Sequence, residues 1–316
     1  MPAPKITPAI LTASPVSRAL LRQARRYAAV DATVLITGET GVGKDALARY
    51  LHASGPRRRE PFVTVDCPAL PATLVESELF GHERGAFTDA TISRAGRFEL
   101  AGRGTLYLDA VTGLNVSGQG ALLRVVEERT VTRLGGTASV DVRARIIASA
   151  DAAVEELVEA GTFRADLFHR LRVLPMHILP LRERQAEVLP LARTFIADIC
   201  HTLKRTAVTL ARDAEDALVR YHWPGNVREL RHVLERVLLA SATEEIRGGD
   251  LPVDVLEGIE GHLAPVDGRP PTLDEVERRY IALTLHRTRG NQTRAAAILG
   301  ISRKALWEKR KRFGLA

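Results

Sequence analysis

The apolar positions in the first part of the chain follow strand and helix periods in alternation. The run "ATVLIT" at residues 32–37 is β-rich, a glycine-rich turn follows it, and an apolar helical pattern starts at Ala46. Further strand-like runs occur at "PFVTVDC", "GTLYLDA" and "VRARIIASA", with helical stretches between them. Strands that alternate with helices are typical of an α/β domain with a mostly parallel sheet. We therefore predict such a domain over residues 10–180.

The pattern changes after this region. Residues 181–247 show helical periodicity only, which predicts a small α-helical subdomain. The segment 248–271 is rich in Gly and Pro and has little periodicity, so we interpret it as a linker. Helical patterns return over residues 272–316, which predicts a separate all-α domain.

The end of the chain has the signals of a helix-turn-helix. Asn291 or Thr293 can cap a helix that ends before Gly300, and Ser302 can cap a second helix over residues 303–313. Gly300 supplies the turn between them. We expect the apolar core of this domain to include Ile298, Leu299, Ile301, Leu306 and Trp307.

The charge is concentrated in the same region. The net charge is +7, and residues 287–316 carry nine Arg or Lys against one acid, a balance of +8, so the remaining 286 residues sum to −1. This asymmetry indicates a basic module that binds polyanions, joined to a nearly neutral body. The alternative is a solvated basic tail. If the second helix enters the major groove, the DNA-binding residues are Arg294, Ser302, Arg303, Lys304, Lys309, Arg310 and Arg312.

Composition narrows the class of protein. The two cysteines are too few for a disulfide framework, and no apolar run is long enough to span a membrane or serve as a signal peptide. We expect a cytoplasmic protein with no membrane partner.

The glycine-rich turn after the first strand is a GxxxxGK phosphate loop. Its glycines allow backbone N–H groups to face phosphates, and Lys44 can neutralise the outer phosphates. The alternative is a glycine turn that binds nothing. Asp45 stands where Ser or Thr commonly supplies a hydroxyl to Mg²⁺. The predicted nucleotide-binding residues are Gly38, Glu39, Thr40, Gly41, Val42, Gly43, Lys44 and Asp45. Asp109 ends the strand "TLYLD", where a carboxylate can reach Mg²⁺ directly or through water.

Six motifs occur in a characteristic order over residues 10–247. They are "GETGVGKD", "ESELFGHERGAFTDA", "GTLYLDA", "FRADLFHRL", "LPLRER" and "YHWPGNVRELR". With them the chain resembles the sigma-54-dependent transcription activators, the bacterial enhancer-binding proteins of the AAA+ class. The stretch "GNQTRAAAILGISRKALWEKRKRFGL" resembles their Fis-type DNA-binding end. The resemblance implies an AAA+ fold with a helical lid, ATP and Mg²⁺ as cofactors, a hexameric ring, and upstream DNA and sigma-54 RNA polymerase as partners.

The resemblance also implies roles for particular residues. Arg164 and Arg170 match arginine fingers that reach the nucleotide of a neighbouring subunit. Arg228 matches the lid arginine that senses nucleotide in its own subunit. The loop that contacts sigma-54 matches Gly85, Ala86, Phe87, Thr88, Asp89 and Ala90, with Asp89 where glycine is more usual. A buried Phe87 in a surface hairpin is the alternative to a partner contact.

Three positions depart from the family pattern around the expected active site. Ala110 stands where a glutamate normally activates the attacking water, and loss of a general base typically costs about 10²- to 10⁴-fold in rate. Asp66 and Asp151 each stand where asparagine is usual. Two hypotheses remain open: the base has moved to Asp66, or all three changes record a decayed site.

Three functions follow from these alternatives. The first is an ATP-driven regulator that remodels the sigma-54 promoter complex. The second is a hydrolysis-impaired DNA-binding regulator that uses ATP for assembly, or that joins a mixed ring whose partner supplies the base. The third is a helicase or DNA-loading ATPase, against which the motif "GAFTDA" argues.

Overall fold

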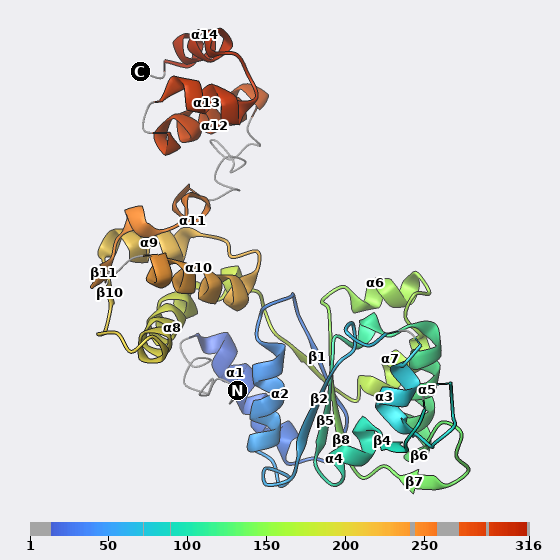
Figure 1. Ribbon diagram of the computed structural model, residues 1–316. Coiled ribbons are helices and arrows are strands. Elements are labelled where there is room, and N and C mark those ends of the chain that lie inside the picture. Colours follow the sequence, from blue (N-terminus) through green and yellow to red (C-terminus); the bar gives the residue numbers. More distant parts are fainter. Residues whose placement is uncertain are drawn as a thin grey trace. The chain divides into compact units, whose positions relative to one another are not determined.

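The computed structural model describes residues 14–71, 73–88, 90–240, 244–257, 272–288 and 291–314 (Figure 1). The chain divides into two compact units. The first comprises the described residues up to Leu191 together with Trp223–Arg231. The second comprises Ala192–His222 and the described residues from His232 onward.

A parallel five-stranded sheet forms the centre of the first unit. Its strands lie in the order β2 (Phe62–Asp66), β5 (Thr105–Asp109), β8 (Arg145–Ala150), β1 (Val34–Thr37) and β9 (Leu174–His177). The four strand-like runs of the sequence correspond to β1, β2, β5 and β8, so the predicted α/β fold is confirmed. Sequence patterns did not indicate β9, because it is short and contains Pro175. Proline is tolerated there because β9 is an edge strand.

Helices cover both faces of this sheet (Figure 1). One face packs against α1 (Pro15–Ala28) and α2 (Lys44–Ala53), around a core that includes Ile36, Leu47 and Tyr107. The other face carries α3 (Val75–Phe80), α4 (Arg97–Ala101), α5 (Val116–Glu128) and α7 (Ala165–Leu171). Leu106 and Leu108 lie in this second core, because successive strand residues point to opposite faces. The short helix α6 (Val154–Glu159) follows β8.

Two small hairpins project from the first unit. β3 (Gly81–His82) pairs with β4 (Arg94–Ala95), and β6 (Thr130–Thr132) pairs with β7 (Ser139–Asp141), both antiparallel. A bridge between His82 and Leu134 joins the two hairpins. Short 3₁₀ turns occur at Val111–Gly113, Leu181–Glu183 and Gln185–Glu187.

The lid region is mainly helical, with α8 (Val188–Thr202), α9 (Arg212–Arg220) and α10 (Asn226–Ala240). Its helical character was predicted, but "helical only" is wrong in one detail. Two short strands, β10 (Thr209–Leu210) and β11 (Glu245–Ile246), pair in parallel. They are too short to produce a recognisable alternating pattern.

The start of the predicted linker also needs correction. Residues 248–257 form a 3₁₀ turn, Gly248–Asp250, and the helix α11 (Val253–Glu257), which contacts α9. The Gly248 N–H donates to Asp213 Oδ2 at 2.9 Å, and Leu251 and Val255 are buried. These contacts fold a stretch whose glycines suggested a linker. Residues 258–271 lie outside the described ranges.

The C-terminal module contains α12 (Leu273–Arg287), α13 (Gln292–Leu299) and α14 (Arg303–Phe313). Its buried core consists of Ile281, Leu285, Ala295, Ala296 and Leu306. The predicted helix-turn-helix is confirmed, but two predicted core residues are not buried. Ile298 is 49% exposed and Trp307 is 55% exposed, because α12 packs on the small alanines instead.

Among the residues that the structure describes, no helix combines the length and apolar character needed to cross a membrane.

Candidate functional site

The phosphate loop lies between β1 and α2, where the sequence predicted it. Gly38, Gly41 and Gly43 have φ values of 152°, 81° and 105°, a region that residues with a Cβ rarely adopt. A Cβ on Gly41 would lie 2.3 Å from the Gly225 carbonyl oxygen. The glycines are therefore required by backbone conformation and by the close approach of the segment around residue 225.

Side chains from distant parts of the chain hold the carbonyl oxygens of this loop. Lys44 Nζ donates to the Gly38 and Glu39 carbonyls, Arg184 Nη2 donates to Val42 at 2.8 Å, and Asn226 Nδ2 donates to Thr40 at 3.1 Å. Four loop carbonyls thus have fixed donors. Sequence reasoning missed the roles of Arg184 and Asn226, although both lie in the motifs "LPLRER" and "GNVREL".

Glu39 connects the loop to two of these segments. Its carboxylate accepts two hydrogen bonds from Arg182, at 2.9 and 2.6 Å, and one from Asn226 Nδ2, at 3.0 Å. The Arg182 guanidinium lowers the pKa of Glu39. Asn226 is fully buried with φ of 52°, a conformation that asparagine tolerates better than most residues. Its Oδ1 accepts from the Leu181 N–H at 2.8 Å.

Several predicted residues surround the Lys44 ammonium. Burial lowers the pKa of Lys44, and the charges of Asp151 and Asp109 act in the opposite direction. The Arg228 charge further lowers this pKa, and the Arg228 N–H donates to the Gly41 carbonyl at 3.3 Å. The structure therefore brings Asp109, Asp151 and Arg228 to the phosphate loop. Asp45, in the first turn of α2, pairs with Arg49 at 2.9 Å.

Asp109 is fixed by two hydroxyl donors. Its Oδ1 accepts from the Tyr107 hydroxyl at 2.9 Å and from Ser149 Oγ at 2.6 Å. Burial raises the pKa of Tyr107, so the phenol remains a donor. Ser149 Oγ also accepts from the Ala110 N–H at 2.8 Å. Neither Tyr107 nor Ser149 was singled out from the sequence, because their roles depend on how β5 and β8 are aligned.

Ala110 has left-handed backbone angles, with φ of 50° and ψ of 58°. Its side chain is partly exposed just after the end of β5. The methyl group can neither accept a proton nor orient water. The backbone conformation is nevertheless compatible with another L-residue, since alanine already bears a Cβ.

Asp66 lies beside Asp109 in the sheet. The two residues are register partners in the parallel pair β2–β5, and Asp66 is exposed. The Phe62 and Tyr107 rings stack with their centroids 6.0 Å apart, on the face of these strands that α2 covers. Because side chains alternate with period two, Asp66 and Asp109 point to this face as well.

Arg164 and Arg170 are exposed and engage local carboxylates. Arg164 precedes α7 and donates to both oxygens of Asp166, at 3.0 and 2.7 Å. This hydrogen bonding lowers the pKa of Asp166 to about 2. Arg170 Nε donates to Glu127 Oε1 at 2.9 Å. Each ion pair would have to open before its arginine could reach another molecule.

The Gly85 loop connects β3 and β4. Gly85 has φ of 84°, and its N–H donates to the Ala90 carbonyl at 2.8 Å. Phe87 is half-buried and packs edge-on against His82, with ring centroids 5.0 Å apart. Ala86 lies against Gly135 of the β6–β7 hairpin, and Thr88 is exposed. Asp89 lies outside the described residues.

The capping predictions for the C-terminal module are confirmed. Asn291 Oδ1 accepts from the Arg294 N–H, and Ser302 Oγ accepts from the Ala305 N–H. The exposed predicted DNA contacts are Arg294, Ser302, Arg303, Lys304 and Arg312. Lys309 and Arg312 form ion pairs with Glu277 and Asp274 of α12, and Lys309 and Arg310 are only partly exposed.

The α/β domain, the lid region and the C-terminal module each match a known protein family. Residues 10–177 match the Sigma-54 interaction domain family, residues 182–264 match the AAA+ ATPase lid domain, and residues 272–313 match the bacterial regulatory proteins of the Fis family. The transcriptional regulatory protein ZraR of Klebsiella oxytoca is 42% identical over 299 residues, covering 95% of this chain and 68% of its own length. The regulatory protein AtoC of Escherichia coli K12 is 39% identical over 312 residues, covering 97% of this chain and 68% of its own length.

Solved structures agree with this assignment. A crystal structure of NtrX from Brucella abortus in complex with ATP aligns with a TM-score of 0.73 and 32% identity, covering 96% of this chain and 69% of NtrX. The chain therefore combines an AAA+ domain, a helical lid and a helix-turn-helix, which is the class of protein to which it belongs. The chain belongs to the sigma-54-dependent transcriptional activators, with a Fis-type module that binds DNA.

Proposed function

We propose that this chain binds ATP with Mg²⁺ at the phosphate loop and acts on the sigma-54 RNA polymerase complex from upstream DNA. The observation that carries this proposal is the grouping of Lys44, Asp109 and Arg228 at one end of the sheet. The ATP complex of the related NtrX supports the choice of nucleotide.

The residues present fit a magnesium ion held jointly with phosphates. Asp109 Oδ1 already accepts two hydrogen bonds, which orients the carboxylate and leaves Oδ2 for the metal or its water. Among the described residues, no group of three or more His, Cys, Asp or Glu side chains could hold a metal by itself. Such a site is typical of Mg²⁺, which is usually bound by one or two carboxylates, substrate phosphates and water, and which neutralises phosphate charge.

We assign the general base to Asp66. It is the exposed carboxylate beside Asp109, on the same face of the sheet as the phosphate loop and α2. In this scheme Asp66 takes a proton from water while the water oxygen attacks the γ-phosphorus. The bond from this phosphorus to the bridging oxygen breaks, which yields ADP and phosphate.

A second function is favoured by a specific observation, the methyl group of Ala110. If Asp66 does not act as base, the bound nucleotide serves only to assemble the regulator, alone or in a mixed ring. The Asp151 carboxylate near Lys44 is compatible with either function.

ATP binding and turnover measured on the same preparations separate the two. We expect Asp66→Asn to bind ATP and lose turnover by at least about 10²-fold, since a general base contributes that much. Ala110→Glu should raise turnover above wild type, because it restores a carboxylate next to Asp109. Asp216→Asn, which removes an exposed carboxylate from α9, is the matched control that should retain turnover.

The outcomes are distinct. Wild-type protein that binds ATP without measurable turnover would establish the second function. Equal turnover by wild type and Asp66→Asn would exclude Asp66 as the base.

The ring and its contacts are also part of the proposal. Arg164 and Arg170 would exchange Asp166 and Glu127 for the γ-phosphate of a neighbouring subunit, where a guanidinium stabilises transition-state charge. The Gly85 loop would contact sigma-54. Because Phe87 packs on His82, we expect that contact to include a rearrangement of the loop.

A further inference from the structure

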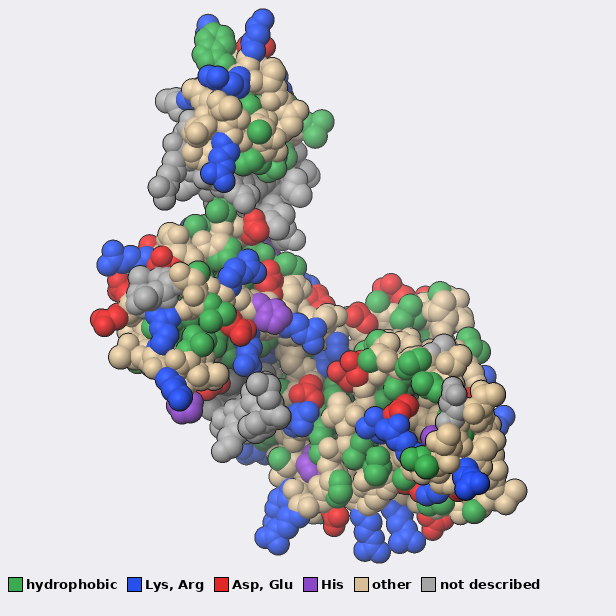
Figure 2. Space-filling view, viewed as in Figure 1, with side chains coloured by type: hydrophobic (Ala, Val, Ile, Leu, Met, Phe, Trp, Pro, Cys, Tyr) green, Lys and Arg blue, Asp and Glu red, His purple; other side chains and the backbone are tan. Residues whose placement is uncertain are grey.

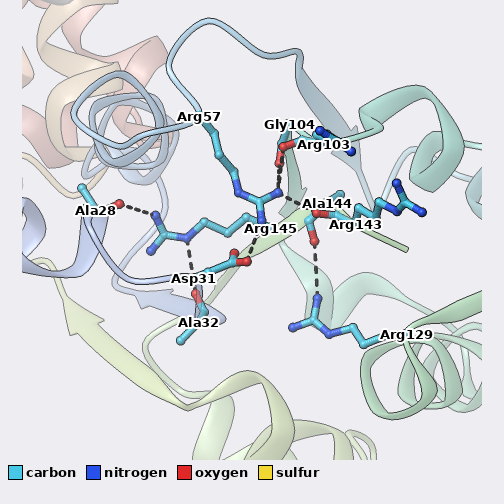
Figure 3. A network of polar contacts seen from close by, with 10 residues as sticks. All are labelled: Ala28, Asp31, Ala32, Arg57, Arg103, Gly104, Arg129, Arg143, Ala144 and Arg145. Atoms are coloured by element: carbon cyan, nitrogen blue, oxygen red, sulfur yellow. Dashed lines mark hydrogen bonds and ion pairs between the residues drawn. The ribbon is translucent and has the colours of Figure 1, made fainter. Parts of the chain in front are cut away.

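Arginines gather at the end of the sheet opposite the phosphate loop (Figure 3). Parallel strands all begin at one edge, and here Phe62, Thr105 and Arg145 are the aligned first residues of β2, β5 and β8. The loops before these strands carry Arg57–Arg59, Arg103 and Arg143.

Arg57 fastens these loops together. Its Nη1 donates to the carbonyl oxygens of Arg143 at 2.6 Å, Arg103 at 2.7 Å and Gly104 at 3.1 Å. Its Nη2 donates to Asp31 Oδ2 at 2.6 Å. The side chain is only 22% exposed, and its guanidinium is used in these hydrogen bonds within the domain. One planar guanidinium can satisfy several acceptors at once, and the loops are thereby held in a fixed arrangement.

Arg145 attaches the end of α1 to the same edge. Its guanidinium is buried and donates to the carbonyl oxygens of Tyr27 at 2.6 Å, Ala28 at 3.1 Å and Ala32 at 3.3 Å. Burial lowers the pKa of Arg145. Arg57 and Arg145 therefore both donate to main-chain carbonyl oxygens. These oxygens are then no longer free acceptors at this surface.

The other four arginines face outward. Arg58, Arg59, Arg103 and Arg143 are exposed, and we call them the arginine platform. Within the described part of the chain, no ion pair is formed by Arg58, Arg59 or Arg103. Arg143 has a 3.4 Å contact with Asp141, and both side chains are more than half exposed. Lys and Arg side chains project from this end of the domain in Figure 2.

The platform is a local feature rather than a reflection of general basicity. The residues before the basic C-terminal module sum to −1, so positive charge at this edge is balanced elsewhere. The loop that carries Arg58 and Arg59 is also held by its own turn, with N–H groups of Arg58 and Glu60 donating to Gly55 and Arg57 carbonyls. Groups that are already ordered lose less entropy when they bind a ligand.

We propose that the arginine platform binds the phosphate backbone of duplex DNA. Guanidinium groups match phosphate oxygens in charge and geometry. The Fis-type module in the same chain binds DNA, which raises the local concentration of phosphates to the millimolar range that a weak surface needs. The platform consists of loop side chains at the N-terminal ends of the strands and places no helix in a DNA groove. Its binding would therefore be independent of base sequence.

The test uses the full chain without nucleotide and mixed-sequence duplexes of two lengths, one just long enough for the Fis-type module and one about three times longer. We expect the wild type to bind the longer duplex about tenfold more tightly. The variant R58Q/R59Q/R103Q/R143Q should lose this difference. Its slope of log affinity against log salt on the longer duplex should be shallower by about 3.6, because each of the four phosphate contacts contributes about 0.9.

The matched control is R124Q/R212Q/R220Q/R236Q, which removes the same charge from exposed positions elsewhere and should keep both the length preference and the slope. Equal losses in the two variants would reduce the effect to net charge and overturn the proposal. An unchanged slope in the platform variant would overturn it too. If the platform proves necessary for single-stranded RNA of the same length and dispensable for the duplex, the surface belongs to an RNA site instead. Unchanged circular dichroism and melting temperature would exclude unfolding as the cause.

Discussion

At the scale of single residues, one hydroxyl on β8 orients the end of the neighbouring strand β5. Ser149 Oγ donates to Asp109 and accepts from the Ala110 N–H, and the side chain is fully buried. The replacement of the usual glutamate by alanine has therefore left the backbone at this position hydrogen-bonded. The hydrogen bonds that hold Asp109 and the Ala110 backbone are present, although position 110 carries no carboxylate.

Ser149→Ala should destabilise the protein by about 1–3 kcal/mol. It leaves the Ala110 N–H without its acceptor and removes a donor from Asp109, and an unsatisfied buried group costs about this much. Urea denaturation measures the change. Ser117→Ala, which deletes an exposed hydroxyl bonded to Glu76, is the control and should stay within about 0.5 kcal/mol of wild type. If both variants unfold at the same urea concentration, the buried hydroxyl has no special role.

Residues within contiguous motifs, and residues at the shared end of neighbouring strands, could be placed from the sequence. Individual hydrogen bonds between strands and between distant segments could not. The proximity of Asp66 to Asp109 follows from two strands that end at the same edge. The roles of Tyr107 and Ser149 depend on the alignment of β5 with β8, and Arg182 meets Glu39 across 143 positions of sequence. No local pattern encodes such pairings.

At the scale of elements, helix caps were the most reliable sequence signals. Asn291 and Ser302 cap α13 and α14 with their side chains, and Gly300 ends α13 with φ of 66°. The structure selects Asn291 over Thr293 as the first cap. These local signals succeed because a cap depends on residues three positions apart.

Ser302→Ala should loosen the start of α14 by about 1 kcal/mol, because the Ala305 N–H loses its acceptor. Hydrogen exchange of α14 amides should become faster by about fivefold, since local opening costs correspondingly less. Thr293→Ala changes an exposed residue within α13 and should leave α14 exchange unchanged. Unaltered exchange in Ser302→Ala would show that packing on α12, rather than the cap, sets the stability of α14.

Elements without strong local signals were missed. The short strands β9, β10 and β11 are defined by their partners, and α11 is defined by its contact with α9. Tertiary contacts also decided which apolar residues of the C-terminal module are buried. α12 supplies Ile281 and Leu285, and Trp307 remains outside with Lys311 Nζ 5.5 Å from its ring centroid.

At the scale of the whole molecule, two segments that are distant in sequence contact the phosphate loop. Residues 182–184 and 226–228 contact a loop that begins at residue 38, and Trp223–Arg231 belong to the same compact unit as the sheet. The helix α10 starts in this unit and continues into the other. The order and spacing of motifs predicted the family. That residues 223–231 belong to the same compact unit as the sheet could be seen only in the structure.

The proposal that the loop binds nucleotide is tested most directly by calorimetric titration of the folded chain with ATP and Mg²⁺. We predict saturable binding at one site per chain, weakened by at least about 100-fold in Lys44→Ala, because the ammonium compensates phosphate charge. Arg124→Ala, which removes a cation from the exposed surface of α5, should bind as wild type does. No heat of binding with the folded wild type, or equal binding by wild type and Lys44→Ala, would contradict the proposed site.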